Sequence, residues 1–218
     1  RKEEDVQMLK ELGFHTFLLD VRNKEHISSA LEKIIKNDSK IDAVFNNAGF
    51  GQPGALEDIK TEVLKEQFET NVFGLHELTR QVLPYMRKQG YGKIIQHSSV
   101  LGIISLRFRG AYNASKYAIE GLADTLRLEL ANTKISICTI NTGPVTSKFR
   151  ENAVKKFQEN VNQENSSYKK EYETQLNARL ENDKDNFKIH TFAIKEVMIQ
   201  SSKSSYAYSG LPSAPPFP

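Results

Sequence analysis

Short runs of β-branched and apolar residues alternate along this chain with longer segments whose apolar residues recur at helical spacing. The helical spacing predicts helices over residues 1–12, 27–35, 61–86 and 109–131. The short apolar runs predict strands over residues 16–19, 41–45, 93–96 and 135–140. Strands that alternate with helices at this spacing form parallel sheets. The pattern therefore predicts an α/β fold, with one parallel sheet covered by helices on both faces.

Polar residues or glycines follow each predicted strand at the point where it ends. Asp20 ends the first strand, Asn46–Gly49 follows the second, Ser98 and Ser99 follow the third, and Thr142–Pro144 follows the fourth. Ligands of open parallel sheets bind beyond the carboxyl ends of the strands. The shared position of these segments predicts a ligand site along one edge of the sheet.

Tyr112 and Lys116 lie four residues apart in the last long predicted helix. At that spacing the two side chains share one helix face. An ammonium beside a phenol favours the phenolate and lowers the Tyr pKa, so Tyr112 could exchange a proton with a substrate oxygen near neutral pH. A chance pairing of two common helix residues is the alternative, and the pair is weak support by itself.

Composition excludes several classes of function. The chain has 218 residues, enough for one domain with a sizeable core, and a net charge of +3 without a block of one sign, which does not suggest nucleic-acid binding. Cys138 is the single cysteine, so no disulfide can form within the chain, as is typical of a reducing compartment such as the cytoplasm. No apolar run reaches membrane-spanning length, so we expect no integral membrane segment. The five histidines are scattered without metal-ligand spacing, and we expect no metal.

Five ordered motifs resemble the short-chain dehydrogenase/reductase family. They are Asn46–Gly49, Asn71 on the long helix, Ser99 placed 13 residues before Tyr112, the pair Tyr112 and Lys116, and Thr142–Val145. The last departs from the family pattern, because Thr142 stands where Pro is usual. The resemblance covers residues 1 to about 149, is weaker near 187–200, and is strongest to bacterial oxidoreductases related to steroid, retinol and aldehyde reductases.

The resemblance implies a Rossmann-like doubly wound sheet of strand order 3-2-1-4-5-6-7 and a set of catalytic residues. Tyr112 would be the proton donor, and Ser99 would hydrogen-bond the substrate carbonyl. Lys116 would hold the nicotinamide ribose and lower the Tyr112 pKa. Asn71 would sit at a local helix distortion and hold a water in a proton relay to Lys116.

The resemblance also implies a dinucleotide site. Tyr112 and Lys116 would contribute to it, together with Arg1, Asp20, Val21, Asn47, Ala48, Gly49, Gly143, Pro144, Val145 and Ser147. Arg1 stands at the end of the family's second strand, where a basic residue favours the 2′-phosphate of NADP. NADP is therefore the expected cofactor, with NAD as the alternative.

The family's first strand and its glycine-rich phosphate loop have no counterpart here, so we expect a chain truncated at its N-terminus. Residues 1–200 are then one incomplete domain, and residues 201–218 a partly disordered tail with a short edge strand at 206–208. Residues 148–186 are polar and predict a loose, solvent-exposed helical insertion on the substrate side, before a final helix at 187–200. Residues 50–56 and 101–109 would complete an apolar substrate pocket.

The leading hypothesis is an NADP-dependent oxidoreductase that interconverts a carbonyl and an alcohol. We expect a cytoplasmic homodimer or homotetramer that pairs through the two long helices. One alternative is a non-catalytic dinucleotide sensor on the same fold, although such sensors typically lose the Tyr or the Lys. The other is an inactive fragment.

Overall fold

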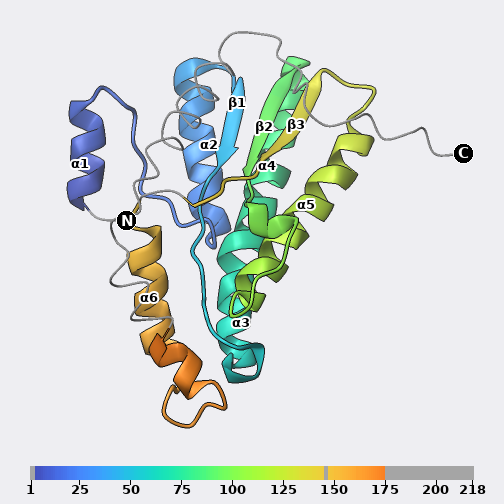
Figure 1. The fold of residues 1–218 in the computed structure, drawn as a ribbon. Coiled ribbons are helices and arrows are strands. Elements are labelled where there is room, and N and C mark those ends of the chain that lie inside the picture. Colours follow the sequence, from blue (N-terminus) through green and yellow to red (C-terminus); the bar gives the residue numbers. More distant parts are fainter. Residues whose placement is uncertain (1–2, 145–146, 175–218) are drawn as a thin grey trace, which may run out of the picture.

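The computed structural model describes residues 3–144 and 147–174, and Figure 1 shows their path. From α2 to β3, helices and strands alternate as the sequence predicts. The helices are α1 (Glu3–Glu11), α2 (Lys24–Asp38), α3 (Thr61–Phe68), α4 (Gly74–Gln89), α5 (Gly110–Glu129) and α6 (Phe149–Asn160). The strands are β1 (Ala43–Asn46), β2 (Gly92–His97) and β3 (Ile135–Ile140), and short 3₁₀ turns span Leu56–Asp58 and Val100–Gly102.

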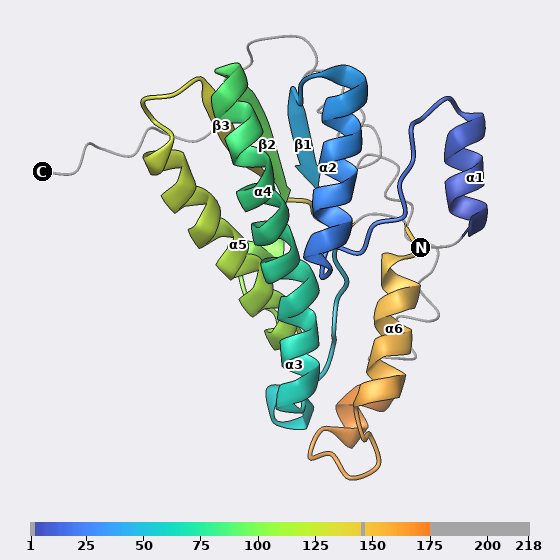
Figure 2. The same cartoon turned by 180° about the vertical axis from the view of Figure 1, so that it is seen from behind.

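The three strands form one parallel sheet in the order β1-β2-β3. Register places Phe45 beside Ile95, and Ile95 beside Cys138. Side chains of α2, α4 and α5 meet β2 and β3 in one apolar core, whose buried members are Ile27, Leu31, Ile41, Val82, Met86, Ile94, Ala123, Leu130, Ile135 and Ile137. Figure 2 shows α2 and α4 side by side in front of the strands. This core fixes the carboxyl ends of β1, β2 and β3 at one level.

The two faces of the sheet differ. The apolar core covers one face, whereas Ser136 and Cys138 of β3 point the other way and are exposed. The expectation of helices over both faces therefore does not hold at β3 within the part of the chain that the structure describes. The composition of β3 gives the reason, because polar or small Ser136 and Cys138 alternate with buried Ile135 and Ile137, whereas a strand covered on both faces is apolar throughout.

The predicted strand at residues 16–19 is wrong. Residues 14–20 are irregular, and Leu18 is 68% exposed. A strand is stabilised by hydrogen bonds to a neighbour, and none of the described strands lies beside this segment. Helix α1 forms as expected, but Met8 and Leu12 on it are also exposed. Helical spacing predicted α1 correctly but could not indicate which element packs against it.

The predicted helix at residues 61–86 is one continuous helical rod with a wide turn inside it. Between α3 and α4, residues Glu69–Phe73 form a π-helical turn, closed by a hydrogen bond from the Gly74 N–H to the Glu69 carbonyl. Pro84 lies inside α4, which continues to Gln89. Gly90 ends it in the left-handed conformation, with φ of 86°.

The region after residue 148 is only partly as predicted. Helix α6 is largely polar and exposed, as its composition indicated. However, it is not loose, because Phe157, Val161 and Tyr172 are buried with Ala55 and Phe108 in a second, smaller core. The Phe157 and Tyr172 rings pack edge to face, 4.9 Å between centroids. A few aromatic residues thus suffice to anchor a segment that reads as polar overall.

Several predictions fall on residues outside the described ranges. They concern Arg1, Val145, the final helix at 187–200, the edge strand at 206–208 and the tail. Among the helices that the structure describes, none combines the length and the apolar character that crossing a membrane requires.

Candidate active site

Helix α5 brings Lys116 to the carboxyl end of β2. The Lys116 side chain is buried, and its Nζ donates a hydrogen bond of 2.6 Å to the carbonyl oxygen of His97, the last residue of that strand. Burial lowers the pKa of the Lys116 ammonium to about 8, and the carboxylate of Glu120, one turn further along α5, opposes the shift. An ammonium whose pKa lies near neutral pH can exchange a proton with a neighbouring acid.

Tyr112 lies one turn before Lys116, and the two side chains share a face as predicted. Lys116 Nζ is 5.5 Å from the centre of the Tyr112 ring. The expectation that Lys116 lowers the pKa of Tyr112 does not hold here, because burial raises that pKa and the main opposing influence is a hydrogen bond with Ser99. The ammonium lies over the ring and bonds to His97, so it gives the phenol oxygen little direct support.

Ser99 lies just beyond β2 and within reach of Tyr112. Its side chain caps the 3₁₀ turn Val100–Gly102 by accepting from the Leu101 N–H at 3.1 Å, and its hydroxyl donates to the Thr142 carbonyl at 3.3 Å. The second bond is long and therefore weak. The hydroxyl proton of Ser99 is consequently easy to redirect to a substrate oxygen beside Tyr112.

Asn71 occupies the centre of the π-helical turn, which matches the distortion expected there. Its side chain is fully buried, and its Oδ1 accepts from the Phe50 N–H at 3.0 Å. Its Nδ2 donates to the Phe50 carbonyl at 2.9 Å and to the Ser115 hydroxyl of α5 at 3.2 Å. Asn71 therefore joins α5 to the loop after β1, while its predicted water relay to Lys116 stays a prediction.

His97 is a site residue that the sequence did not reveal. Its Nδ1 hydrogen-bonds Asn47 Oδ1, and its Nε2 lies 2.9 Å from the Thr142 hydroxyl. The ring thus ties together the residues that follow β1 and β3. Burial lowers the pKa of His97 to about 4, and the positive charge of Lys116 adds to the shift. The only possible sequence signal was its position at the end of a predicted strand.

The residues predicted to hold a dinucleotide lie near the strand ends. Asn47, Ala48 and Gly49 follow β1, and Gly143 and Pro144 follow β3. A Cβ at Gly49 would lie 3.1 Å from Asn71 Oδ1, so a larger residue there would press on the Asn71 amide. Ser147 lies before α6 and accepts from the Phe149 N–H. Their cofactor roles stay predictions.

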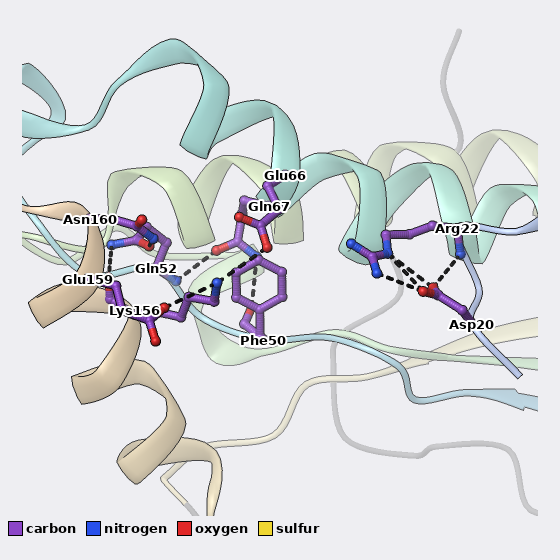
Figure 3. Close-up of polar contacts among 9 residues, drawn as sticks. All are labelled: Asp20, Arg22, Phe50, Gln52, Glu66, Gln67, Lys156, Glu159 and Asn160. Carbon is purple, nitrogen blue, oxygen red and sulfur yellow. Dashed lines mark hydrogen bonds and ion pairs between the residues drawn. The ribbon is translucent and has the colours of Figure 1, made fainter. Parts of the chain in front are cut away.

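Asp20 and Val21 lie beside the start of α4. Asp20 forms a two-pronged ion pair with Arg22, drawn at the right of Figure 3, in which Nη2 and Oδ2 are 2.7 Å apart. Val21 is buried against Gly74, where a Cβ would come within 2.7 Å of Val21 Cγ2. An adenine contact by either residue stays a prediction.

Two buried glutamines beside the site also escaped the sequence reasoning. Gln52 and Gln67 are fully buried, and Gln67 lies one turn before Asn71 on the same helical rod. A glutamine in a helix normally indicates an exposed face, so the spacing to Asn71 was the only available signal. An open pocket of about 610 Å³ lies between residues 54–57, residues 105–108 and Tyr117; it overlaps the predicted substrate pocket, although Tyr112 does not line it.

Comparison with known proteins agrees with this geometry. Residues 1–158 match the model of the short chain dehydrogenase family. The chain is 41% identical over 153 residues to the uncharacterized oxidoreductase YbbO of Escherichia coli, covering 70% of this chain and 57% of the relative. It is 39% identical to the 3-ketodihydrosphingosine reductase of Bacteroides thetaiotaomicron, covering 62% of this chain and 50% of that protein.

The fold has solved counterparts as well. The structure of ElxO with NADP bound matches with a TM-score of 0.61 and 25% identity, covering 64% of this chain and 59% of that chain. The chain thus spans about half the length of the curated relatives it matches. The matched family model, these relatives and the arrangement of Ser99, Tyr112 and Lys116 lead to one conclusion: the chain belongs to the short-chain dehydrogenase/reductase family of oxidoreductases.

Proposed function

We propose that the full-length protein is an NADP-dependent reductase or dehydrogenase that interconverts a carbonyl and an alcohol. The observation that carries the proposal is the pairing of Tyr112 with the buried ammonium of Lys116, beside Ser99 at the end of β2. A phenol, a cation and a hydroxyl in that arrangement suit proton transfer to an oxygen that gains charge during reduction.

The residues around Lys116 fit a nicotinamide cofactor. An ammonium has three N–H donors, and among the described residues one hydrogen-bond acceptor, the His97 carbonyl oxygen, is within reach of Lys116 Nζ. The remaining donors suit ribose hydroxyls, and Asn47, Gly49 and Gly143 border the same strand ends. NADP is favoured over NAD because Arg1 suits a 2′-phosphate and because ElxO has been solved with NADP bound. When bound, the cofactor supplies or accepts the hydride.

The chain's own residues then handle the substrate oxygen. During reduction, Tyr112 donates its hydroxyl proton to that oxygen as the C–H bond forms on the carbonyl carbon. Ser99 donates a second hydrogen bond to the same oxygen. The resulting Tyr112 phenolate then regains a proton from water, Lys116 holds the cofactor ribose, and Asn71 holds α5 against the loop after β1. Oxidation of an alcohol uses the same groups in reverse.

An apolar substrate is the class that the surrounding side chains favour. Ile103 and Leu106, on the loop that follows Ser99, are 61% and 53% exposed. The relative from Bacteroides thetaiotaomicron is named as the reductase of a ketone, 3-ketodihydrosphingosine. We propose aldehydes or ketones with an extended apolar part as substrates.

We also propose a homodimer or homotetramer that pairs through the α3–α4 rod and α5. Apolar side chains on these helices are exposed, including Phe73 at 52% and Leu128 at 79%. Burying such side chains against a second copy would remove apolar surface from water. Light scattering of the full-length protein at micromolar concentration should give a multiple of the monomer mass, and a monomer would contradict this assembly.

The sharpest test of the chemistry is Tyr112→Phe in the full-length protein, assayed by NADPH oxidation with decanal. The variant keeps the ring and removes only the acidic hydroxyl, so turnover should fall by about 10²–10⁴-fold. NADPH affinity, measured by fluorescence titration, should stay unchanged. Tyr91→Phe is the matched control, because Tyr91 bonds Asp42 just before β2, at the opposite end of that strand from the site. Near-normal turnover by Tyr112→Phe would reject the proposed function.

A further inference from the structure

Two buried amides from one helical rod hold the main chain of the loop after β1. Asn71 bonds both the N–H and the carbonyl of Phe50. Gln67, one turn earlier, donates from Nε2 to the same Phe50 carbonyl at 2.7 Å and accepts the Gln52 N–H on Oε1 at 2.8 Å. The two amides therefore clamp three consecutive residues, and Gln67 makes the only one of these contacts that reaches Gln52.

The Gln52 side chain carries the connection on to α6, as Figure 3 shows. Its Nε2 donates to the carbonyls of Pro53 at 2.8 Å and Lys156 at 3.3 Å. Its Oε1 accepts from Asn160 Nδ2 at 2.8 Å. Lys156 also forms an ion pair with Glu66 of α3, 3.3 Å between Nζ and Oε1. Both side chains are partly exposed, so this pair contributes little to stability.

Helix α6 in turn lies against the proposed proton donor. Phe149, its first residue, packs on Tyr112 with 5.6 Å between ring centres. Gly51 lies against both rings, because a Cβ there would come within 3.1 Å of the Phe149 ring and 3.6 Å of Tyr112 Cδ2. The segment that Gln67 and Gln52 hold is thus the surface on which both rings rest.

We propose that Gln67 and Gln52 are positioning residues that couple the turn around Asn71 to α6 and so set the cover over Tyr112. Neither glutamine touches Tyr112, and both act through the loop and α6. The buried amides suit this role, because a buried polar group that loses its hydrogen-bond partner costs free energy. The network is therefore held in one geometry. The kinetic consequence rests on the proposed function, whereas the mechanical coupling does not.

Amide hydrogen exchange in the full-length protein tests the coupling directly. Gln67→Met keeps the length of the side chain and removes its donor and acceptor. Exchange in α6 should become about tenfold faster, because one buried group is left without a partner. Gln81→Met is the matched control, since Gln81 bonds Ser28 and the Lys24 carbonyl on α2. That control should loosen α2 and leave α6 unchanged. Wild-type exchange of α6 in Gln67→Met would overturn the proposal.

A double-mutant cycle separates coupling from simple loss of stability. Asn160→Ala breaks the far end of the same chain of hydrogen bonds, and Asn160 does not contact Gln67. If the bonds act as one unit, Asn160→Ala should speed α6 exchange less in the Gln67→Met background than alone. Additive effects would count against the coupling. Where Gln67→Met does not fold, Asn160→Ala alone must raise exchange at residues 52–55, and unchanged exchange there would refute the idea.

The kinetic constants provide a second test, because a purely structural role would not change KM selectively. In Gln67→Met the KM for decanal should rise about tenfold, while kcat and the NADPH affinity change far less, because the acid and the cofactor side stay in place. An equal fall in kcat with unchanged KM would contradict a role in setting the cover. If the unsubstituted protein reduces no carbonyl compound, the proposed function fails, but the exchange results still decide the coupling.

Discussion

The part that carries Tyr112 and the part that covers it are built by different physical means. The platform, formed by β1–β3 and α5, rests on an apolar core in which Ile94 is fully buried. The cover, helix α6, rests on a few aromatic side chains and on hydrogen bonds to Gln52. Dense apolar packing holds the platform that carries Tyr112, whereas a small core and a few amides hold the helix that covers it. The cover can therefore change with little effect on the acid.

The largest effect should come from Lys116→Met on the platform. Turnover should fall by more than the loss from Tyr112→Phe, because the variant removes both the group that holds the cofactor ribose and the cation beside the proton donor. NADPH affinity should fall as well, as a fluorescence titration would measure. The fold should survive and gain thermal stability, since the variant removes a buried cation whose pKa is lowered by desolvation. Unchanged NADPH affinity would remove Lys116 from the cofactor site.

Truncation of the platform core should affect the whole protein. Ile94→Ala removes a fully buried side chain, so the free energy of unfolding should fall by about 2–5 kcal/mol. Urea denaturation followed by circular dichroism gives this value. The contrary outcome is faster hydrogen exchange in α6 alone, with no change in the urea midpoint. It would show that the two regions do not have separate cores.

Tyr172→Phe should produce a smaller effect, confined to the cover. The Tyr172 hydroxyl donates to Asp58 and accepts the buried Ala55 N–H at 2.7 Å, and burial with Asp58 raises its pKa to about 12. Its removal leaves the Ala55 amide without a partner and should cost about 1–3 kcal/mol in local exchange of α6. Tyr168→Phe, which keeps the ring contact with Phe108, is the control. Equal losses in both variants would argue that ring packing alone holds the cover.

At neutral pH the smallest effect should come from the titration of His97, because its pKa change alters the stability of the platform only at acid pH. The folded state lowers the His97 pKa from 6.5 to about 4, so between these values the unfolded chain binds more protons. Stability should therefore fall as pH falls from about 6.5 to about 4. His97→Asn should remove this part of the slope in melting temperature against pH. An identical slope in the variant would show that folding does not lower the His97 pKa.

Much of the platform could be predicted from the sequence because local patterns specify it. The strand predicted at 135–140 coincides with β3, and the helix predicted at 109–131 differs from α5 by one residue at its start and two at its end. The spacing of Tyr112 and Lys116 placed both on one face, and the distortion at Asn71 is present. These features depend on residues that are close in sequence, and a periodic pattern is a property of such residues.

What failed depended on distant partners. Residues 16–19 carry strand-forming side chains, but no periodicity reveals whether a neighbouring strand is present. Gln67 and Gln52 have the sequence character of ordinary polar residues, and their burial follows from the loop after β1 and from α6, which are distant in sequence. Phe157 and Tyr172 lie in a polar stretch whose average composition concealed a small core. The raised pKa of Tyr112 likewise came from its burial, which no spacing could show.

The wide turn at Glu69–Phe73 has a consequence for how the length of this helix can vary. A π-helical turn closes with one more residue than an α-helical turn. The rod therefore holds one residue beyond what a regular helix needs to present the same faces of α3 and α4. Deleting one residue there would close the turn and leave both flanking faces in register, while withdrawing the Asn71 amide from Phe50. At this point in the chain a change in length would alter the loop beside the site and spare the helix packing.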